Sequence, residues 1–510
     1  MSGAGKSLKF VKATGNSVVD SLLTGDAWIG TITYAFPTWR GSYGCGFDKY
    51  YGFTSISAAQ AKTALFAMEQ SYGSAANDGF SVEGFTNASF KAGSASTATI
   101  RFAQSWLPDT AYAYLPALDA SGGDIWFGTA YAGTADDYRK PIAGNYAWHT
   151  LLHELGHALG LKHGHEGDVY GASPARYDSI EYSIMTYRGY IGADECYYYE
   201  QFGAPQTFMM ADIAALQEMY GADFTTDAGN TVYKWTPGGG TTFVNGGAGI
   251  SPGANRIFAT IWDGGGNDTY DLSAYTNALK IDLRPGSAST FSIDQLAWLG
   301  GGPNGGFAAG NIFNALLYHG DARSLIENVN GGSSGDSIMG NQAANVLWGY
   351  GGNDRLNGDT GNDTLYGGSG SDRIYGGKGN DKLYGESGND LLYAAAGADR
   401  LNGGSGSDSF TFKALSDSTV AKSGRDTIFD FTAKSDRIDL SAIDADTSSA
   451  GDQAFGFVKS AAFSGKKGEL RYVRDVSDTY IYGDVNGDRK ADFAIHLDDA
   501  VTLQKGYFVL

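Results

Sequence analysis

The chain has 510 residues, which is enough for two to four folded units rather than one core. Its 75 glycines and only 10 prolines argue against a collagen-like or proline-rich disordered chain and favour many tight turns. With 56 acidic and 36 basic residues, the net charge of −20 makes nucleic acids and anionic membrane surfaces poor partners, whereas a hard cation such as calcium is a natural complement.

The cysteine count and the hydropathy pattern exclude several other classes. Cys45 and Cys196 are the 2 cysteines, so neither a disulfide framework nor a cysteine-ligated metal site is expected. The first ten residues carry two lysines without a following apolar stretch, and we therefore expect no general secretory signal there. No apolar run approaches the length of a membrane span.

The first section of the chain predicts a mixed α/β domain. Its expected elements, in order, are a helix at 17–23, a strand at 28–36, a helix at 56–72, and strands at 97–102 and 124–131. We expect the last strand to form a sheet edge on which an extended peptide can pair its backbone.

The next predicted helix, 146–161, carries the chemistry. His153 and His157 are one helical turn apart, so both imidazoles can bind a single ion, while Glu154 projects close to the same metal. Gly160 then allows a sharp turn that brings back His163 as a third ligand. Three protein nitrogens leave zinc a fourth position for water, which is the arrangement of a catalytic site.

Five of the 7 histidines lie between positions 149 and 165, more than one zinc ion can use. Ligands at positions i, i+4 and i+8 of a helix span about 12 Å, so His149 cannot share an ion with His153 and His157. We therefore interpret His149 and His165 as packed or solvated side chains rather than ligands.

After the third histidine, Ser183-Ile-Met-Thr-Tyr187 follows at about twenty residues. Together with the zinc motif, this pattern resembles the metzincin metalloproteases, and in detail their serralysin branch. The resemblance implies that Met185 forms the floor beneath zinc, and that Tyr187 contacts the metal and swings away to hydrogen-bond the reaction intermediate. Residues 205–217 resemble the last helix of the protease domain, and Gly164 departs from the proline found in many serralysins. Ordinary core packing of Met185 and Tyr187 is the alternative.

Residues 331–411 divide without gaps into nine nonapeptides close to Gly-Gly-x-Gly-Asn-Asp-x-Leu-x. This is the repeat of the calcium-binding RTX parallel β-roll, in which one aliphatic residue per repeat points inward. The predicted calcium-binding acids are Asp336, Asp354, Asp363, Asp372, Asp381, Asp390, Asp399 and Asp408, with Asp268 in an isolated turn of the same kind at 261–272. The predicted glycines at these sites are Gly349, Gly358, Gly367, Gly376 and Gly385.

If one turn of the roll contains two repeats, nine repeats allow up to seven calcium sites. The repeats containing Asn345 and residues 394–396 are degenerate, so sites that share them should be weaker. A further acidic loop at 484–492 is as consistent with a metal-free turn as with a cation site.

The predicted fold class is multidomain, α/β followed by all-β. The expected order is a candidate pro-segment (1–20), a metzincin catalytic domain (21–245), a junction with the isolated calcium turn (246–330), the parallel β-roll (331–411), and a C-terminal β-sandwich cap with a secretion signal (412–510). The last residues, Tyr507 to Leu510, resemble the uncleaved signal read by type I secretion systems.

These observations predict a secreted zinc endopeptidase that hydrolyses proteins with Glu154 as general base. One catalytic Zn²⁺ and several structural Ca²⁺ ions are the expected cofactors, and the expected partners are protein substrates, the type I secretion apparatus and a proteinaceous inhibitor, with the enzyme itself a monomer. Folding would follow export, since extracellular calcium is about millimolar. The alternative is a calcium-dependent adhesive RTX protein with a vestigial protease domain. A third interpretation, an RTX cytolysin, is disfavoured because the sequence lacks the hydrophobic membrane segments expected of one.

Secretion leaves three states open for the cysteines. Cys45 and Cys196 can pair in a disulfide, can both remain free thiols, or Cys45 can cap the zinc as an inhibitory thiolate.

Overall fold

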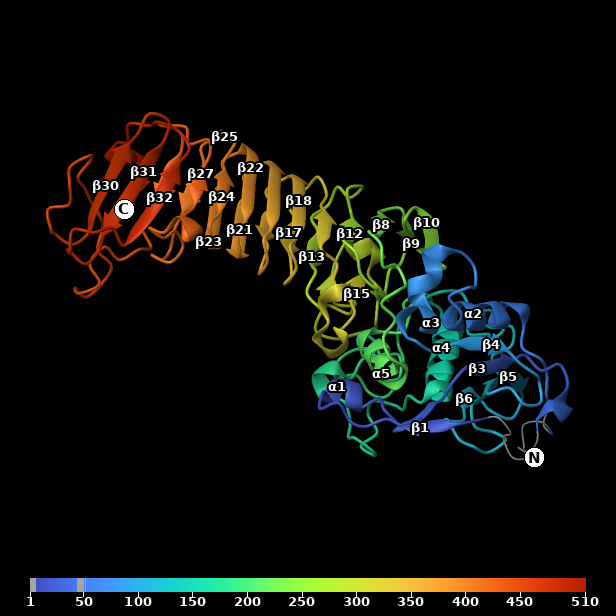
Figure 1. Cartoon of the computed structure of the whole chain (residues 1–510). Coiled ribbons are helices and arrows are strands. Elements are labelled where there is room, and N and C mark those ends of the chain that lie inside the picture. Colours follow the sequence, from blue (N-terminus) through green and yellow to red (C-terminus); the bar gives the residue numbers. More distant parts are fainter. Residues whose placement is uncertain (1–5, 44–49, 51) are drawn as a thin grey trace. The chain divides into compact units, whose positions relative to one another are not determined.

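The computed structural model describes residues 6–43, 50 and 52–510 (Figure 1). The chain forms two compact units, described here one at a time. The first comprises Met1–Asp268 and Pro285–Ile326, and the second comprises Thr269–Arg284 and Glu327–Leu510.

A five-stranded sheet organises the first unit. Its strand order is β4 (Phe90–Ala92), β3 (Ile32–Ala35), β5 (Ile100–Ser105), β7 (Asp124–Gly128) and β6 (Ala111–Ala113), and all neighbours are parallel except β6 with β7. The expectation that the strand at 124–131 is a sheet edge was wrong, because β6 pairs with it and takes the edge. A three-residue strand of alternating Ala and Tyr is too short to produce a periodic signal.

An ion pair is buried between the two central strands of this sheet. Arg101 Nε lies 2.7 Å from an Asp124 carboxylate oxygen, and the two side chains are only 3% and 2% exposed. Burial is the dominant influence on the acid and raises the pKa of Asp124 to about 7 despite the guanidinium.

Helix α4 (Tyr146–Leu159) lies against α2 (Ala58–Met68) and against β6 and β7. It starts where the Asn145 side chain accepts a hydrogen bond from the Trp148 amide at 2.9 Å, and it ends at Gly160, whose φ of 113° is in the left-handed region. The helix predicted at 146–161 is therefore present, and it ends two residues earlier than expected, at Leu159. The unit also contains the α-helices α1 (Ser17–Asp20), α3 (Val82–Phe85) and α5 (Met210–Tyr220).

The start of the chain packs against this unit. Strand β1 (Leu8–Phe10) pairs antiparallel with β2 (Asp26–Trp28), and the buried Val11 carbonyl accepts a 2.8 Å hydrogen bond from the Tyr170 hydroxyl. The candidate pro-segment thus includes residues that contribute to the core. The unit is completed by β8 (Val232–Thr236), β9 (Gly239–Val244), β10 (Gly247–Ile250), β11 (Ala259–Ile261), β14 (Ala288–Ser289) and β15 (Ile312–Asn314).

The second unit is mostly a roll of two parallel sheets (Figure 1, yellow to red). One sheet contains β12 (Thr269–Asp271), β16 (Asn328–Asn330), β18 (Val346–Gly351), β20 (Thr364–Ser369), β22 (Lys382–Gly388), β24 (Arg400–Asn402) and β25 (Ser405–Gly406). The other contains β13 (Lys280–Asp282), β17 (Ser337–Met339), β19 (Arg355–Asn357), β21 (Arg373–Lys378), β23 (Leu391–Ala396) and β26 (Ser409–Thr411). Within the repeats, neighbouring strands of a sheet pair residues 18 apart, such as Leu347 with Leu365, so one turn contains two nonapeptides.

The core of the roll consists of apolar side chains contributed in turn by the two sheets. The eighth position of every repeat is at most 1% exposed, from Ile338 to Phe410. These side chains point inward because successive residues of a strand alternate between its faces.

The cap extends the same two sheets beyond the repeats. On one side follow β27 (Thr427–Ile428), β32 (Phe493–Leu497), β31 (Thr479–Asp484), β30 (Glu469–Arg474) and β29 (Gly456–Phe457). On the other side follow β28 (Arg437–Asp439) and β33 (Phe508–Val509). The last strand of the chain is therefore part of the folded cap.

Candidate active site and cation sites

Three imidazoles converge at the C-terminal half of α4. The Nε2 atom of His163 lies 3.2 Å from Nε2 of His153 and 3.0 Å from Nε2 of His157. These three residues form a cluster whose ligand atoms all lie within 4.8 Å of one another. Neutral imidazole nitrogens in this number and arrangement fit one zinc ion with a position left open.

The hydrogen bonds made by Nδ1, the ring nitrogen that points away from the cluster, determine the tautomer of two of these histidines. Nδ1 of His153 donates to the Ile184 carbonyl at 2.7 Å, and Nδ1 of His157 donates to the Leu161 carbonyl at 2.8 Å. With Nδ1 protonated, the Nε2 lone pairs are free to bind a metal. Burial lowers the pKa of His157 to about 4, which keeps this ligand neutral.

The turn after α4 brings the third histidine back. The Leu161 amide donates to the Gly156 carbonyl at 2.9 Å, and the Lys162 amide donates to the Leu22 carbonyl at 2.8 Å. His163 is therefore held by the helix end and by the N-terminal segment together.

Met185 lies directly against the helix at this point. It is fully buried, and a methyl group added to Gly156 would lie 2.6 Å from its sulfur. The segment that carries it is fixed by Asp212, whose carboxylate accepts from the Ile184 amide at 2.8 Å and from the Ser183 hydroxyl at 2.5 Å. Asp212 was not identified from the sequence, although the same Ile184 holds His153 in place.

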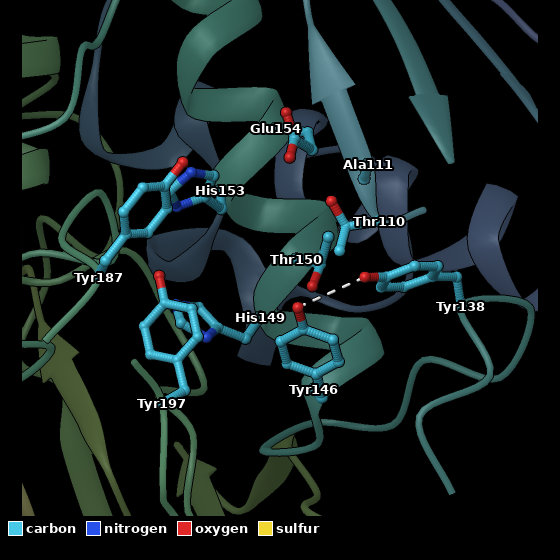
Figure 2. A pocket seen from close by; sticks show the side chains of 10 residues that line it. All are labelled: Thr110, Ala111, Tyr138, Tyr146, His149, Thr150, His153, Glu154, Tyr187 and Tyr197. Carbon is cyan, nitrogen blue, oxygen red and sulfur yellow. Dashed lines mark hydrogen bonds between the residues drawn. The ribbon is translucent and has the colours of Figure 1, made fainter. Parts of the chain in front are cut away.

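Glu154 faces a pocket next to the imidazoles (Figure 2). It is 5% exposed, and its Oε2 atom has no hydrogen-bond partner among the described residues. Burial raises the pKa of the Glu154 carboxyl to about 8, close to the range that suits a general base at neutral pH.

The Tyr187 ring lies over the cluster, with its centroid 4.4 Å from that of His163. It also stacks at 5.9 Å on His153 (Figure 2). Burial raises the pKa of Tyr187 to about 12, so its hydroxyl keeps its proton and can donate a hydrogen bond.

The other two histidines of this region lie beside the cluster. His149 is 1% exposed, and its Nδ1 lies 2.8 Å from the Tyr199 hydroxyl. His165 stacks on His163 at 5.3 Å. Tyr197 and Tyr199 pack against His149. No motif in the sequence indicated that these two tyrosines lie at the site.

The roll contains a ladder of buried carboxylates. From Asp354 to Asp408, one oxygen of each aspartate accepts a hydrogen bond from the backbone amide 18 residues earlier, as from Asp354 to Asp372 at 2.8 Å. The other oxygen, Oδ2, is buried and has no hydrogen-bond partner among the described residues in Asp354, Asp363, Asp372, Asp381, Asp390, Asp399 and Asp408. Asp336 differs, because its two oxygens accept from the amides of Leu279 at 2.9 Å and Gly332 at 2.7 Å. A row of unpaired buried carboxylate oxygens fits hard cations, because a buried charge needs a compensating partner.

The predicted glycines lie against these same oxygens. A Cβ on Gly349, Gly358, Gly367, Gly376 or Gly385 would collide with Oδ2 of the aspartate five residues later. Only glycine therefore allows the backbone to approach the carboxylate so closely.

The ladder has an internal break and a continuation that the sequence did not indicate. The Asn345 side-chain amide donates to the Glu327 backbone carbonyl at 2.9 Å and to the Asn341 side-chain oxygen at 3.1 Å, so this rung is neutral and satisfied. Asp426 and Asp436 accept from the amides of Asp399 and Asp408, at spacings of 27 and 28 residues. Their Asp-x-Ile sequences match the repeats, but the change of spacing conceals them.

The isolated turn at 261–272 lies in an acidic environment. Asp268 accepts from the Thr231 amide at 2.7 Å, and Asp263 accepts from the Tyr233 hydroxyl at 2.8 Å. Burial and the charge of Asp268 raise the pKa of Asp263 to about 9, as expected for acids that share a site without a cation. In the loop at 484–492, by contrast, Asp484 accepts hydrogen bonds from the amides of its own turn, at Gly487 and Arg489.

Cys196 is exposed, and Cys45 lies outside the described residues. Within the part of the chain that the structure describes, no helix is long and apolar enough to cross a membrane.

Comparison with known proteins places the chain in a family. The sequence profile described as Peptidase M10 serralysin C terminal matches residues 222–509, which is more than half of the chain. The chain belongs to this serralysin family.

Individual relatives agree with this assignment. The chain is 31% identical to metallopeptidase AprA of Pseudomonas marginalis over 333 residues, covering 62% of this chain and 61% of the relative. It is also 31% identical to the serralysin of Proteus mirabilis over 331 residues, covering 62% and 60%. The chain thus spans about three fifths of the length of these relatives. A solved subunit of the Azotobacter vinelandii mannuronan C5-epimerase, AlgE6R3, covers 35% of this chain and 80% of its own at 26% identity, but its TM-score of 0.16 supports no structural argument.

Proposed function

We propose that the protein is a zinc endopeptidase that hydrolyses peptide bonds of protein substrates. The observation that carries this proposal is the convergence of three neutral imidazoles beside the buried Glu154, all of which line one pocket. The names of the relatives, metallopeptidase and serralysin, support the same activity.

His153, His157 and His163 would hold the zinc ion. Zinc, when bound, supplies Lewis acidity to a substrate carbonyl and lowers the pKa of water to about 7. Glu154 accepts a proton from the attacking water and delivers it to the leaving amine, a contribution of about 10²–10⁴-fold. The protonated Tyr187 hydroxyl donates a hydrogen bond where the oxyanion develops.

Calcium completes the proposal for the second unit. The unpaired carboxylate oxygens of the ladder bind calcium, and folding of the roll waits for extracellular calcium after export by a type I system. The partners would be protein substrates, the export apparatus and a proteinaceous inhibitor.

The test of the activity is Glu154→Gln. This variant should bind one zinc ion per chain, measured by atomic absorption, yet lose casein hydrolysis by at least about 100-fold. A Glu154→Gln protein with wild-type turnover would contradict the proposal. A wild-type protein that binds calcium but neither binds zinc nor cleaves casein would favour the adhesive alternative.

A further inference from the structure

A second feature of the site is a small pocket beside Glu154, on the side of the N-terminal half of α4 (Figure 2). Its volume is about 80 Å³, and its walls come from α4, from the edge strand β6 and from Tyr138 and Tyr197. Because Glu154 must reach the scissile bond, the side chain that enters this pocket belongs to a residue flanking that bond.

The walls present hydroxyl groups. The Tyr138 hydroxyl donates to the Tyr146 hydroxyl at 3.4 Å, and the side chains of Thr110 and Thr150 line the same space. Burial raises the pKa of both tyrosines, so they remain neutral and can donate or accept hydrogen bonds.

Glu154 is the one acidic residue among the described residues of the lining, and the proposed reaction uses it as the general base. No lysine or arginine lines the pocket among these residues. Burial lowers the pKa of His149 to about 4, so this histidine is neutral as well. A charged side chain would lose its hydration here without gaining an ionic partner.

The volume decides against large side chains. A protein cavity of about 150 Å³ accommodates benzene. The pocket has about half that volume, so a phenyl ring does not fit, whereas a side chain of two to four heavy atoms does.

We propose that Tyr138 and Tyr146 determine substrate specificity by selecting small uncharged side chains that carry a hydroxyl or an amide, namely Ser, Thr and Asn, at one position flanking the scissile bond. Thr is preferred over the isosteric Val because only Thr has a hydroxyl that can form a further hydrogen bond with the tyrosine hydroxyls. This inference rests on the proposed peptidase function.

The test uses the full-length protein loaded with zinc and calcium and a peptide library that varies both residues flanking the cleaved bond. Mass spectrometry of the products should show one position enriched in Thr, Ser and Asn, with kcat/KM for Phe or Lys at that position lower by about 10-fold or more. Tyr138→Phe and Tyr146→Phe should each reduce the ratio of kcat/KM for Thr over Val. Tyr146→Ala enlarges the pocket and should raise kcat/KM for Phe.

Tyr34→Phe is the matched control, because Tyr34 lies in β3, outside the pocket, with its hydroxyl on Glu69 at 2.7 Å. Its profile should equal that of the wild type. Equal cleavage of Thr and Phe peptides by the wild type, or an unchanged Thr-to-Val ratio in both phenylalanine variants, would overturn the inference while leaving the peptidase function intact. Absence of cleavage of both the library and casein would instead refute the peptidase function and the inference with it.

Discussion

His163 is held differently from the other two histidines of the cluster. Its Nδ1 lies 2.9 Å from a Glu166 carboxylate oxygen, whereas His153 and His157 donate to backbone carbonyls. A carboxylate behind a ligating imidazole fixes its orientation and raises its basicity more than a carbonyl does. Glu166 is 40% exposed, so the carboxylate that supports His163 is accessible to solvent.

Glu166→Gln should weaken zinc binding by about 10–100-fold, because the imidazole loses its anionic acceptor. Competition with a chromogenic chelator measures this change directly. Asp168→Asn is the control, since Asp168 carries the same charge and pairs with Lys162 at 3.4 Å without contacting an imidazole. Equal zinc affinity of Glu166→Gln and the wild type would show that Glu166 gives His163 no support.

The residues of the site differ in how far the sequence could predict them. The spacing of His153, Glu154 and His157 determines their common face, because helix geometry depends on local sequence only. Glu166, Tyr138 and Tyr197 come from irregular segments, where no periodicity links a residue type to a position. Their proximity results from tertiary packing and required the structure.

Among the elements, the roll strands were the most predictable. Each repeats one pattern in which the eighth residue is buried, so local sequence and tertiary environment agree nine times. Strand β6 was missed because its three residues are too few to show the alternation of a strand. The rungs at Asp426 and Asp436 were missed because the intervening chain lengthens.

Gly379→Ala should destabilise the roll. Gly379 has φ = 144°, and an added Cβ would overlap the Gly361 carbonyl oxygen. The strained backbone alone costs about 1–3 kcal/mol, and the overlap adds to this. Calcium titration followed by circular dichroism should show a higher midpoint for the variant.

The matched control is Gly506→Ala in the cap. A Cβ added to Gly506 meets nothing within 4 Å, and its φ is outside the left-handed region. This variant should titrate like the wild type. A similar midpoint for Gly379→Ala would mean that the backbone at this turn can relax, contrary to our expectation.

At the scale of the whole molecule, the carboxylate ladder links the second unit to pH. Burial raises the pKa of Asp354 and Asp363 to about 7 and that of Asp381 to about 6, compared with about 3.9 in an unfolded chain. Without calcium, the folded form therefore binds protons more tightly than the unfolded form. The stabilisation that these carboxyl groups contribute is complete below about pH 4 and is lost as the pH rises through 6 to 7.

Calcium-stripped protein should therefore melt at a higher temperature at pH 5 than at pH 8 in the transition of the second unit. Saturating calcium should produce the opposite trend, since only ionised carboxylates bind the cation. Thermal circular dichroism at both pH values, with and without calcium, measures the four states. A calcium-free melting temperature independent of pH would contradict the raised pKa values.

The hydrogen bonds of the carboxylate ladder all run in the same direction along the chain. Each rung is an amide that donates to a carboxylate further along the chain, and the final two amides, of Asp399 and Asp408, find their acceptors only in Asp426 and Asp436 of the cap. The hydrogen-bond ladder of the roll is therefore completed only at its C-terminal end, by residues of the cap. A chain that ends after the ninth repeat would leave the amides of Asp399 and Asp408 without these acceptors. We expect unfolding of such a roll to begin at that end.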